Sequence, residues 1–363
     1  MRVQSLHIEG FRNLAKTALN FDGDASFVAL VGSNGQGKTN VLEALFLLGI
    51  SKSFRTTENG EMVGFDQDYF SVKGDIERKE GPLKAEVIVT REPPKKTLKL
   101  DGGIKKASEY IGNLSVVFFS PDDLGMIHLS PSLRRRYLDL LISQLDRGYL
   151  ESAIKYQSAL KQRNSLLRRI GEEQAQESEL EFWDQELAKN GAQILSGRAR
   201  VIGQIGAFAG DYYPKATGAG DTLTIEYLPS GHATDEQSLL DAIAKHHSRD
   251  LALGATQTGP HRDDLRFLVN GHDLASFGSR GEWRSLVLTL KFAEIELLKE
   301  KNGETPILLL DDVFSELDEI RQKTLFSSIK DCQTFLTTTH REFLGMIEAE
   351  KQIFTVTQGT VSP

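Results

Sequence analysis

The stretch FVALVGSNGQGKTNVLEALFLLG, residues 27–49, decides the fold. An apolar run with strand character leads into GSNGQGKT, residues 32–39, and apolar residues at helical spacing follow. The octapeptide fits the P-loop pattern GxxxxGKT, whose glycines let backbone N–H groups crowd around phosphate oxygens at a helix start. Since strand, loop and helix occur in the required order, this interpretation is favoured over a chance glycine-rich turn. We expect the chain to bind a nucleoside triphosphate.

The residues of the loop have separate expected tasks. Lys38 would place its charge on the β- and γ-phosphates and take part in catalysis. Thr39 would offer its hydroxyl to Mg²⁺. The rest of the loop would cradle the phosphates through its backbone; these residues are Gly32, Ser33, Asn34, Gly35, Gln36 and Gly37.

Composition narrows the class of protein. The chain has 363 residues, and single cores stop growing at roughly 250 to 300 residues, so two structural units are expected. One cysteine, Cys332, excludes an internal disulfide and fits a reducing compartment. No signal peptide and no apolar run near the roughly 18 residues of a membrane span are present, so we expect a cytoplasmic protein without a membrane partner. A net charge of −8 means that any nucleic-acid surface is a local patch.

Hydrophobic patterning predicts an α/β chain with a helical insertion. The final third alternates helix and strand, which builds a parallel sheet. Short strands separated by turns before residue 100 predict an antiparallel layer. From Pro131 onward, helical spacing with a polar turn at 171–178 predicts two antiparallel helices. The expected strands are 3–8, 17–21, 27–31, 69–76, 84–90, 96–100, 115–119, 223–227, 307–310, 334–338 and 353–357, with a strand pair around Asn270-Gly271. The further expected helices are 38–48, 237–253, 282–299, 320–329 and 341–347, and residues 211–231 are expected to be a connection.

Two strand ends carry side chains suited to the second half of a nucleotide site. The apolar strand from Ile307 ends in Asp311 and Asp312, which we assign to the metal and to water activation. An acidic helix cap is the alternative for Asp312. One strand later, His340 could meet a γ-phosphate, and the alternative is a structural histidine.

The segment FGSRGE, residues 277–282, opens a strong helix. Its local pattern is a capping box, with Ser279 capping and Glu282 reaching back. A helix start flanked by glycine and serine is also an anion site, so Ser279 is a candidate catalytic residue as well.

Basic residues gather in two stretches. Residues 91–106 hold six basic residues on an expected hairpin, and residues 133–170 hold nine on the expected helical arm. Solvated faces are the alternative to phosphate contact for both. The candidate DNA contacts are Lys95, Lys96, Lys105, Lys106, Arg134, Arg135, Arg136, Arg168 and Arg169.

Taken together, the motifs carry a family resemblance. The P-loop, SRGE, LLLDD, SELD and TTTH occur in the order of the ATP-binding-cassette (ABC) ATPases, and IEGFRNL at 8–14 resembles the SMC branch. KSFR at 52–55, LRRRYLD at 133–139, TGPHRDD at 258–264 and LDDVFSELD at 310–318 resemble the RecF family. The resemblance implies an ABC-type P-loop ATPase head, with a mixed sheet core plus an antiparallel β layer, and an inserted α-helical arm domain. The implied boundaries are 1–130 with 256–363 for the ATPase domain and 131–255 for the arm.

The resemblance implies a recombination-mediator ATPase of bacterial DNA repair. Such proteins dimerise head to tail around ATP, so Ser279 would act in trans, on the nucleotide held by the other subunit. Arg12 and Asn13 match nucleotide-contacting positions of the SMC branch, and Arg55 is a second expected phosphate contact. The implied partners are single- and double-stranded DNA at junctions, a second copy of the chain, and RecR-like and RecO-like mediators.

Three departures from the cassette pattern bear on hydrolysis. Asp312 stands where transporters carry glutamate, and Arg280 replaces a signature glycine. Both changes would slow hydrolysis, so we expect a weak, DNA-stimulated ATPase. Ser120-Pro121-Asp122 occupies the place of the glutamine loop, whose glutamine is missing.

Other classes of P-loop protein fit less well. The nucleotide-binding subunit of an ABC transporter would have a glutamine loop and a much shorter gap between P-loop and signature than the one from Thr39 to Ser279. The same gap is too short for the long coiled coil of an SMC protein. A small-molecule kinase would leave Ser279 and His340 unexplained.

Overall fold

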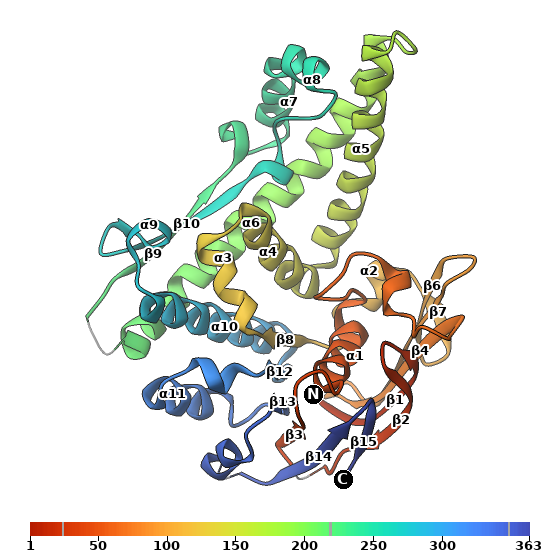
Figure 1. The fold of residues 1–363 in the computed structure, drawn as a ribbon. Coiled ribbons are helices and arrows are strands. Elements are labelled where there is room, and N and C mark those ends of the chain that lie inside the picture. Colours follow the sequence, from red (N-terminus) through yellow and green to blue (C-terminus); the bar gives the residue numbers. More distant parts are fainter. Residues whose placement is uncertain (24, 218–219, 348) are drawn as a thin grey trace. The chain divides into compact units, whose positions relative to one another are not determined.

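The protein is described by a computed structural model that covers residues 1–23, 25–217, 220–347 and 349–363 (Figure 1). It divides into two compact units: the first is Met1–Asp123 with Val287–Pro363, and the second is Leu124–Leu286. The division differs from the expected boundaries at 131 and 255. Residues 256–286 belong to the second unit because β10 (Asp264–Val269) pairs there with β9 (Leu223–Leu228). Ser279 is therefore part of the second unit.

The first unit is built on a mainly parallel sheet with strand order β15-β14-β3-β13-β12-β8. Its strands are β3 (Phe27–Val31), β8 (Val116–Phe119), β12 (Ile307–Asp311), β13 (Thr334–Thr338), β14 (Lys351–Thr357) and β15 (Thr360–Ser362). Only β15 runs antiparallel to its neighbour. All five residues of β3 are buried, as expected for a strand covered on both faces. The predicted parallel sheet is confirmed.

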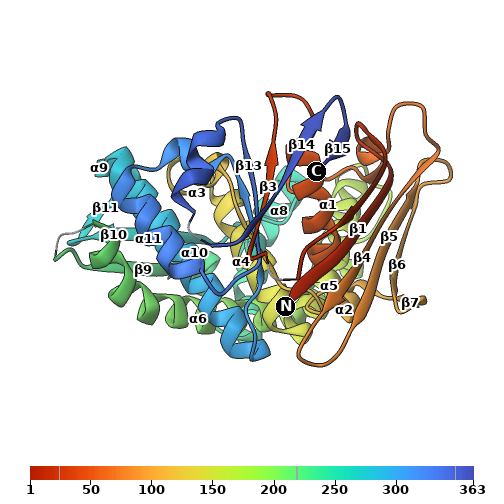
Figure 2. The same ribbon diagram turned by 90° about the horizontal axis from the view of Figure 1, so that it is seen from below.

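An antiparallel sheet forms a second layer of the first unit. Its strand order is β2-β1-β4-β5-β6-β7. The strands are β1 (Arg2–Phe11), β2 (Leu14–Asn20), β4 (Tyr69–Glu77), β5 (Leu83–Thr90), β6 (Lys95–Leu100) and β7 (Gly103–Lys105). Helix α1 (Lys38–Ile50) packs against strands of both sheets, and Figure 2 shows it between them. Because α1 lies between two layers, it is buried on nearly every side, which explains its continuous apolar sequence.

Smaller helices complete the first unit. They are η1 (Asn59–Met62), α2 (Ala107–Tyr110), η6 (Val313–Glu316), α11 (Glu319–Ile329) and η7 (Arg341–Met346), where η denotes a 3₁₀ helix. The helix expected at 341–347 is the 3₁₀ helix η7. The 3₁₀ helix η2 (Pro121–Leu124) and helix α10 (Arg280–Asn302) run across the division between the units.

The second unit is mainly helical, with a small sheet of order β11-β10-β9. Its other elements are α3 (Gly125–His128), α4 (Pro131–Leu145), α5 (Arg147–Gly171), η3 (Glu177–Glu179), α6 (Leu180–Thr217), η4 (Ser230–His232), α7 (Glu236–Lys245), α8 (His247–Leu253), η5 (Pro260–Arg262), β11 (His272–Asp273) and α9 (Leu274–Phe277). Helices α5 and α6 pack against each other along the arm (Figure 1). Among the residues covered, no helix is both long and apolar enough to span a membrane.

Several predicted boundaries in this unit are wrong. The segment predicted to form two antiparallel helices forms three, α4, α5 and α6, because Asp146 ends α4 and its side chain accepts a hydrogen bond from the Tyr149 N–H (3.1 Å) at the start of α5. The helix expected at 237–253 is broken at His246 into α7 and α8. The connection expected from residue 211 begins later, because α6 continues to Thr217; residues 218 and 219 of that connection lie outside the described part of the chain.

Candidate nucleotide site

The predicted nucleotide residues of the first unit meet at one edge of the parallel sheet. The P-loop follows β3, Asp311 ends β12, and His340 follows β13. Strand register aligns Asp311 with Thr337, and Thr338 with Val31. The carboxyl ends of parallel strands are where open α/β sheets bind ligands, and here they gather segments far apart in sequence.

The P-loop has the backbone that its glycines allow. Gly35 and Gly37 have φ of 77° and 111°, in the region that favours glycine, and α1 begins directly after Gly37. The Lys38 Nζ donates to the backbone oxygens of Gly32 (2.7 Å) and Ser33 (2.9 Å). Burial lowers the pKa of Lys38, and the nearby carboxylates of Asp312 and Asp311 act in the opposite direction. The ammonium is thus held inside its own loop, where phosphate oxygens can replace the two carbonyls.

Thr39 and Asp311 are paired, as the sequence predicts for a magnesium site. The Thr39 hydroxyl donates to Asp311 Oδ1 at 2.9 Å, and the Thr337 hydroxyl donates to the same oxygen at 2.7 Å. Mg²⁺ in nucleotide sites is usually held by one or two protein oxygens together with phosphates and water. Within the described residues, no cluster of three or more His, Cys, Asp or Glu forms a protein-only metal site. The hydroxyl and carboxylate oxygens therefore fit a magnesium ion that arrives with a nucleotide.

Asp312 has an unusual backbone. Its φ and ψ of 50° and 31° are left-handed, and its N–H donates to the Thr337 hydroxyl at 3.0 Å. Non-glycine residues in this region are uncommon and cluster at functional sites. Although Asp312 occupies the N-cap position of the 3₁₀ helix η6, its side chain makes no capping hydrogen bond.

His340 lies at the same edge with 55% of its side chain exposed. Its Nδ1 is 3.1 Å from Glu342 Oε1, and its backbone N–H donates to the Thr338 hydroxyl at 3.0 Å. A structural histidine would be buried with both ring nitrogens satisfied by the protein. The exposed imidazole is instead accessible to a ligand.

Arg12 and Arg55 converge on a carboxylate that the sequence analysis missed. Glu43 in α1 is fully buried and accepts from Arg12 Nε and Nη2 at 3.0 and 2.7 Å. Ser53 Oγ donates to it at 2.5 Å, and Arg55 Nη1 lies 3.6 Å away. A buried acid in an otherwise apolar helix requires cationic or hydroxyl partners. The position of Glu43 within the apolar helix could therefore have predicted such partners from the sequence. Glu43 fixes the two arginines beside the P-loop.

Ser279, in the second unit, forms the predicted capping box. The Ser279 N–H and hydroxyl donate to Glu282 Oε2 at 2.8 and 2.7 Å, and the Glu282 N–H lies 3.3 Å from Ser279 Oγ. Ser279 is exposed at the start of α10. Trp283 anchors this turn by donating from Nε1 to the Leu274 oxygen at 2.8 Å and by stacking on His128.

Arg134 is a correction among the candidate DNA contacts. It is 8% exposed, and its Nε and Nη2 donate to the two carboxylate oxygens of Asp264 at 2.6 and 3.0 Å. Its Nη1 donates to the Met126 oxygen at 2.9 Å and to the Ile127 oxygen at 3.2 Å. With its donors used inside the second unit, Arg134 is not available to a phosphate.

The other candidates differ in exposure. Lys96 is a second correction: it is half-buried and donates to the Ser51 oxygen at 2.7 Å, and burial lowers its pKa. Arg135 and Arg136 are half-buried, and Arg135 Nη1 donates to the Asp263 oxygen at 2.7 Å. The exposed candidates are Lys95, Lys105, Lys106, Arg168 and Arg169.

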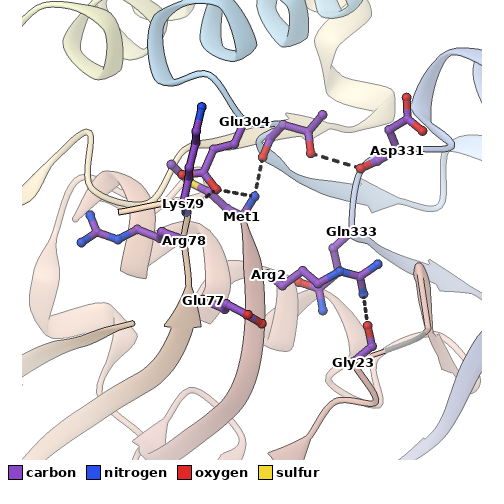
Figure 3. A pocket seen from close by; sticks show the side chains of 10 residues that line it. Met1, Arg2, Gly23, Glu77, Arg78, Lys79, Glu304, Asp331 and Gln333 are labelled. Carbon is purple, nitrogen blue, oxygen red and sulfur yellow. Dashed lines mark hydrogen bonds and ion pairs between the residues drawn. The ribbon is translucent and has the colours of Figure 1, made fainter. Parts of the chain in front are cut away.

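A pocket of the first unit lies at a different place and does not belong to this site (Figure 3). It is lined by residues such as Met1, Arg2, Thr305 and Gln333, which precede or begin their strands. It therefore marks the amino-terminal edge of the sheet, opposite the P-loop edge. The Met1 ammonium, one of its charged groups, lies 3.0 Å from Glu304 Oε2.

Comparison with known proteins shows the family of this chain. The family model described as RecF/RecN/SMC N terminal domain matches residues 2–362. The chain is 36% identical to a DNA replication and repair protein RecF of Lysinibacillus sphaericus (strain C3-41), with 99% of each chain covered. It is 37% identical to the corresponding protein of Agathobacter rectalis (strain ATCC 33656), again with 99% of each covered.

Solved structures agree with the sequence relatives. One described as the recombination mediator protein RecF-ATP in the RecFOR pathway matches with a TM-score of 0.90 and 34% identity, covering 99% of this chain and 96% of that one. A second, described as RecF-ATPrS, has the same TM-score and identity and is covered to 97%. An SMC head bound to the winged-helix domain of ScpA matches with a TM-score of 0.56 at 16% identity, which shows a shared fold.

Proposed function

Because this chain belongs to the RecF family of DNA replication and repair proteins, we propose that it binds ATP with Mg²⁺ at the P-loop edge and couples that binding to DNA. The observation that carries the proposal is the pairing of Thr39 with Asp311 (2.9 Å) beside the Lys38 ammonium. These groups come from two segments 272 residues apart and supply the charge and oxygen ligands that a Mg²⁺-nucleotide requires.

The expected chemistry follows from the positions of these side chains. Backbone N–H groups of the P-loop hold the phosphates, and Lys38 moves its charge from the loop carbonyls to the β- and γ-phosphates. Thr39 and Asp311 would hold the magnesium ion, which would supply positive charge to neutralise the phosphates. Asp312 orients water, and His340 contacts the γ-phosphate. Because Asp312 is shorter than glutamate and Arg280 replaces a glycine, hydrolysis is slow. DNA stimulates it.

The proposed cycle uses ATP as a signal for assembly. ATP closes a head-to-tail dimer in which Ser279 of one copy meets the γ-phosphate held by the other, with Arg12, Asn13 and Arg55 near the nucleotide. The closed dimer holds DNA near a junction of single and double strand, and slow hydrolysis releases it. With RecR-like and RecO-like partners in the cytoplasm, it supports recombinase loading, SOS induction and replication-fork maintenance. The similarity to RecF structures of the RecFOR pathway supports this proposal.

The DNA contacts are proposed on the exposed basic residues. Exposed lysines and arginines can release counterions when they meet phosphates, whereas Arg134 and Lys96 cannot without losing internal partners. The proposed set is the exposed Lys95, Lys105, Lys106, Arg168 and Arg169, together with the half-buried Arg135 and Arg136.

A light-scattering measurement of mass with ATP, ADP and a junction DNA tests the proposal. We expect a dimer that retains DNA with ATP, and a monomer with ADP. Ser279→Ala should bind ATP but dimerise weakly, and Ser276→Ala, on the exposed surface of α9, is the matched control. A chain that stays monomeric with ATP, and binds DNA equally with either nucleotide, would refute the proposed cycle. Normal dimerisation of the Ser279 variant would refute its role in trans.

A further inference from the structure

The turn between β14 and β15 touches the P-loop. Gln358 and Gly359 form this turn with φ of 47° and 77°, the positive values of a tight type I′ hairpin. The Gln358 N–H donates to the side-chain oxygen of Gln36 at 2.7 Å. The Gly359 N–H donates to the backbone oxygen of Gln36 at 2.9 Å. The N–H groups of both turn residues therefore donate to the same P-loop residue, Gln36.

Asn13 holds the same carbonyl from another strand connection. Its Nδ2 donates to the Gln36 backbone oxygen at 3.2 Å, and its Oδ1 accepts from Asn40 Nδ2 at 2.7 Å. The fit is close on both sides. A Cβ added to Gly37 would lie 2.7 Å from Asn13 Oδ1, and one added to Gly359 would lie 2.1 Å from the Asn13 backbone oxygen.

These contacts fix the orientation of one peptide group. The peptide bond between Gln36 and Gly37 is trans, because the single cis bond in the described residues is Glu92–Pro93. In a trans peptide the carbonyl and the N–H point in opposite directions. With the Gln36 carbonyl held by Gly359 and Asn13, the Gly37 N–H must point away from both of them. In a P-loop this N–H is one of the groups that cradle phosphate.

We propose that Asn13, Gln36 and the Gln358–Gly359 turn are positioning residues that orient the Gly37 N–H toward the nucleotide. This inference rests on the proposed binding of ATP. It adds a role for Asn13: its Nδ2 and Oδ1 both bond within the protein, and the bond to the Gln36 oxygen lets Asn13 act on the orientation of the Gly37 N–H. Because the cradled phosphate is common to ATP and ADP, the positioning serves both nucleotides equally.

Gly359→Ala is the strongest test, because it adds a methyl group against the Asn13 backbone and strains a positive φ. The matched control is Gly102→Ala. Gly102 (φ 81°) follows Asp101 (φ 50°) in the β6–β7 turn of the same unit, and a Cβ there meets nothing within 4 Å. Both variants lose similar backbone freedom, but only the first displaces Asn13 and Gln36. We expect roughly tenfold weaker binding of both ATP and ADP for Gly359→Ala and unchanged binding for Gly102→Ala.

If Gly359→Ala does not fold, Gln36→Ala and Asn13→Ala test the same proposal. Each removes a side-chain contact at the protein surface and leaves the backbone free to adopt its native angles. Each should weaken ATP and ADP by the same factor, and their effects should be non-additive because both act on one peptide group. In a glycine-selective amide spectrum, the Gly37 resonance should shift with ADP in the wild type and shift less in the variants.

The outcomes separate this inference from the proposed function. A wild-type chain that binds neither nucleotide would overturn both. A wild type that binds ADP, with folded Gly359, Gln36 and Asn13 variants that bind it equally well, would overturn the inference alone. A loss confined to ATP would also overturn it, because it would place the effect at the γ-phosphate.

Discussion

Polar side chains serve different purposes in the two units. The P-loop edge of the first unit includes accessible polar side chains: His340 is 55% exposed and Arg55 is 48% exposed. In the second unit, arginines are buried between acids. Arg163, which is fully buried, lies 2.5 Å from Asp184 and 2.6 Å from Asp250. A cluster of arginines in sequence therefore indicates a ligand surface only where the folded chain does not pair those arginines with aspartate or glutamate.

The buried network of the second unit explains a motif that the nucleotide site does not use. In TGPHRDD, Asp263 accepts from Arg198 Nη1 at 2.9 Å and from the Ser230 N–H at 2.8 Å. Tyr227 also donates its hydroxyl to Asp263. Asp264 pairs with Arg134. The two aspartates of the motif therefore connect the helices α4 and α6 to the small sheet. Removing either arginine would leave its aspartate without a cationic partner, which is destabilising.

Arg134→Ala should have the largest effect of the substitutions considered. If Arg134 is structural, its loss should lower the free energy of unfolding of the second unit by about 3 to 5 kcal/mol, since Asp264 loses its bidentate partner. Urea unfolding measures this, with the half-buried Arg135→Ala as a milder control. A variant of wild-type stability with weakened DNA binding would return Arg134 to the DNA surface.

Lys38→Ala tests the role of the P-loop edge in the first unit. Because the ammonium is held beside the P-loop carbonyls and supplies the charge for the phosphates, nucleotide affinity should fall on the order of a hundredfold. Calorimetric titration with ATP measures the loss, and the melting temperature reports whether the fold is kept. Retained ATP affinity in a folded variant would show that the nucleotide binds elsewhere.

The pH dependence of stability at His261 tests whether the hydrogen-bonded side chains of the second unit are shielded from water. Burial lowers the pKa of His261 to about 4. The ring nitrogens lie 2.7 Å from the Tyr156 hydroxyl and 3.0 Å from the Thr256 oxygen. Arg262 and Arg135 also lower the pKa, whereas the Thr256 contact and Asp250 raise it. The folded state therefore binds fewer protons than the unfolded state between pH 6.5 and 4, and stability falls as the pH falls through that range.

The measurement compares His261→Gln with the wild type at pH 7 and pH 5. The wild type should lose roughly 1 to 2 kcal/mol more unfolding free energy over this interval than the variant, which has no imidazole to protonate. Other acids of the network titrate in both proteins and cancel in the difference. Equal pH dependence would mean that the ring is solvated, and that the network is open.

Local signals made the nucleotide site predictable. The strand, glycine loop and helix at 27–49 lie together in sequence, and the Ser279 capping box spans four residues. Asp311 was predictable because a buried strand ends there. Pairings across long separations were not. Arg134 and Asp264 are 130 residues apart, and nothing near Arg134 indicates that its acid will be supplied by β10. Likewise, helical periodicity continues through Asp146, where side-chain capping of the Tyr149 N–H ends one helix and starts another.

The exposed end of α5 provides the smallest expected effect. Arg168 Nε donates to the Asn164 oxygen within α5 at 3.0 Å, and Arg169 Nη2 donates to the oxygen of Gln174, beyond the end of α5, at 3.3 Å. Both side chains are exposed. Replacing both by Ala should change stability by less than about 0.5 kcal/mol. If both meet phosphates, DNA affinity should fall several-fold at low salt, and the slope of log affinity against log salt should shrink by roughly 2. Arg147→Ala is the control, because Arg147 is 61% exposed on the same helix but paired with Glu151 at 3.0 Å. An unchanged salt slope in the double variant would show that this end of the arm is a solvated face, and would leave the proposed DNA surface to the β6–β7 lysines and the half-buried arginines of α4.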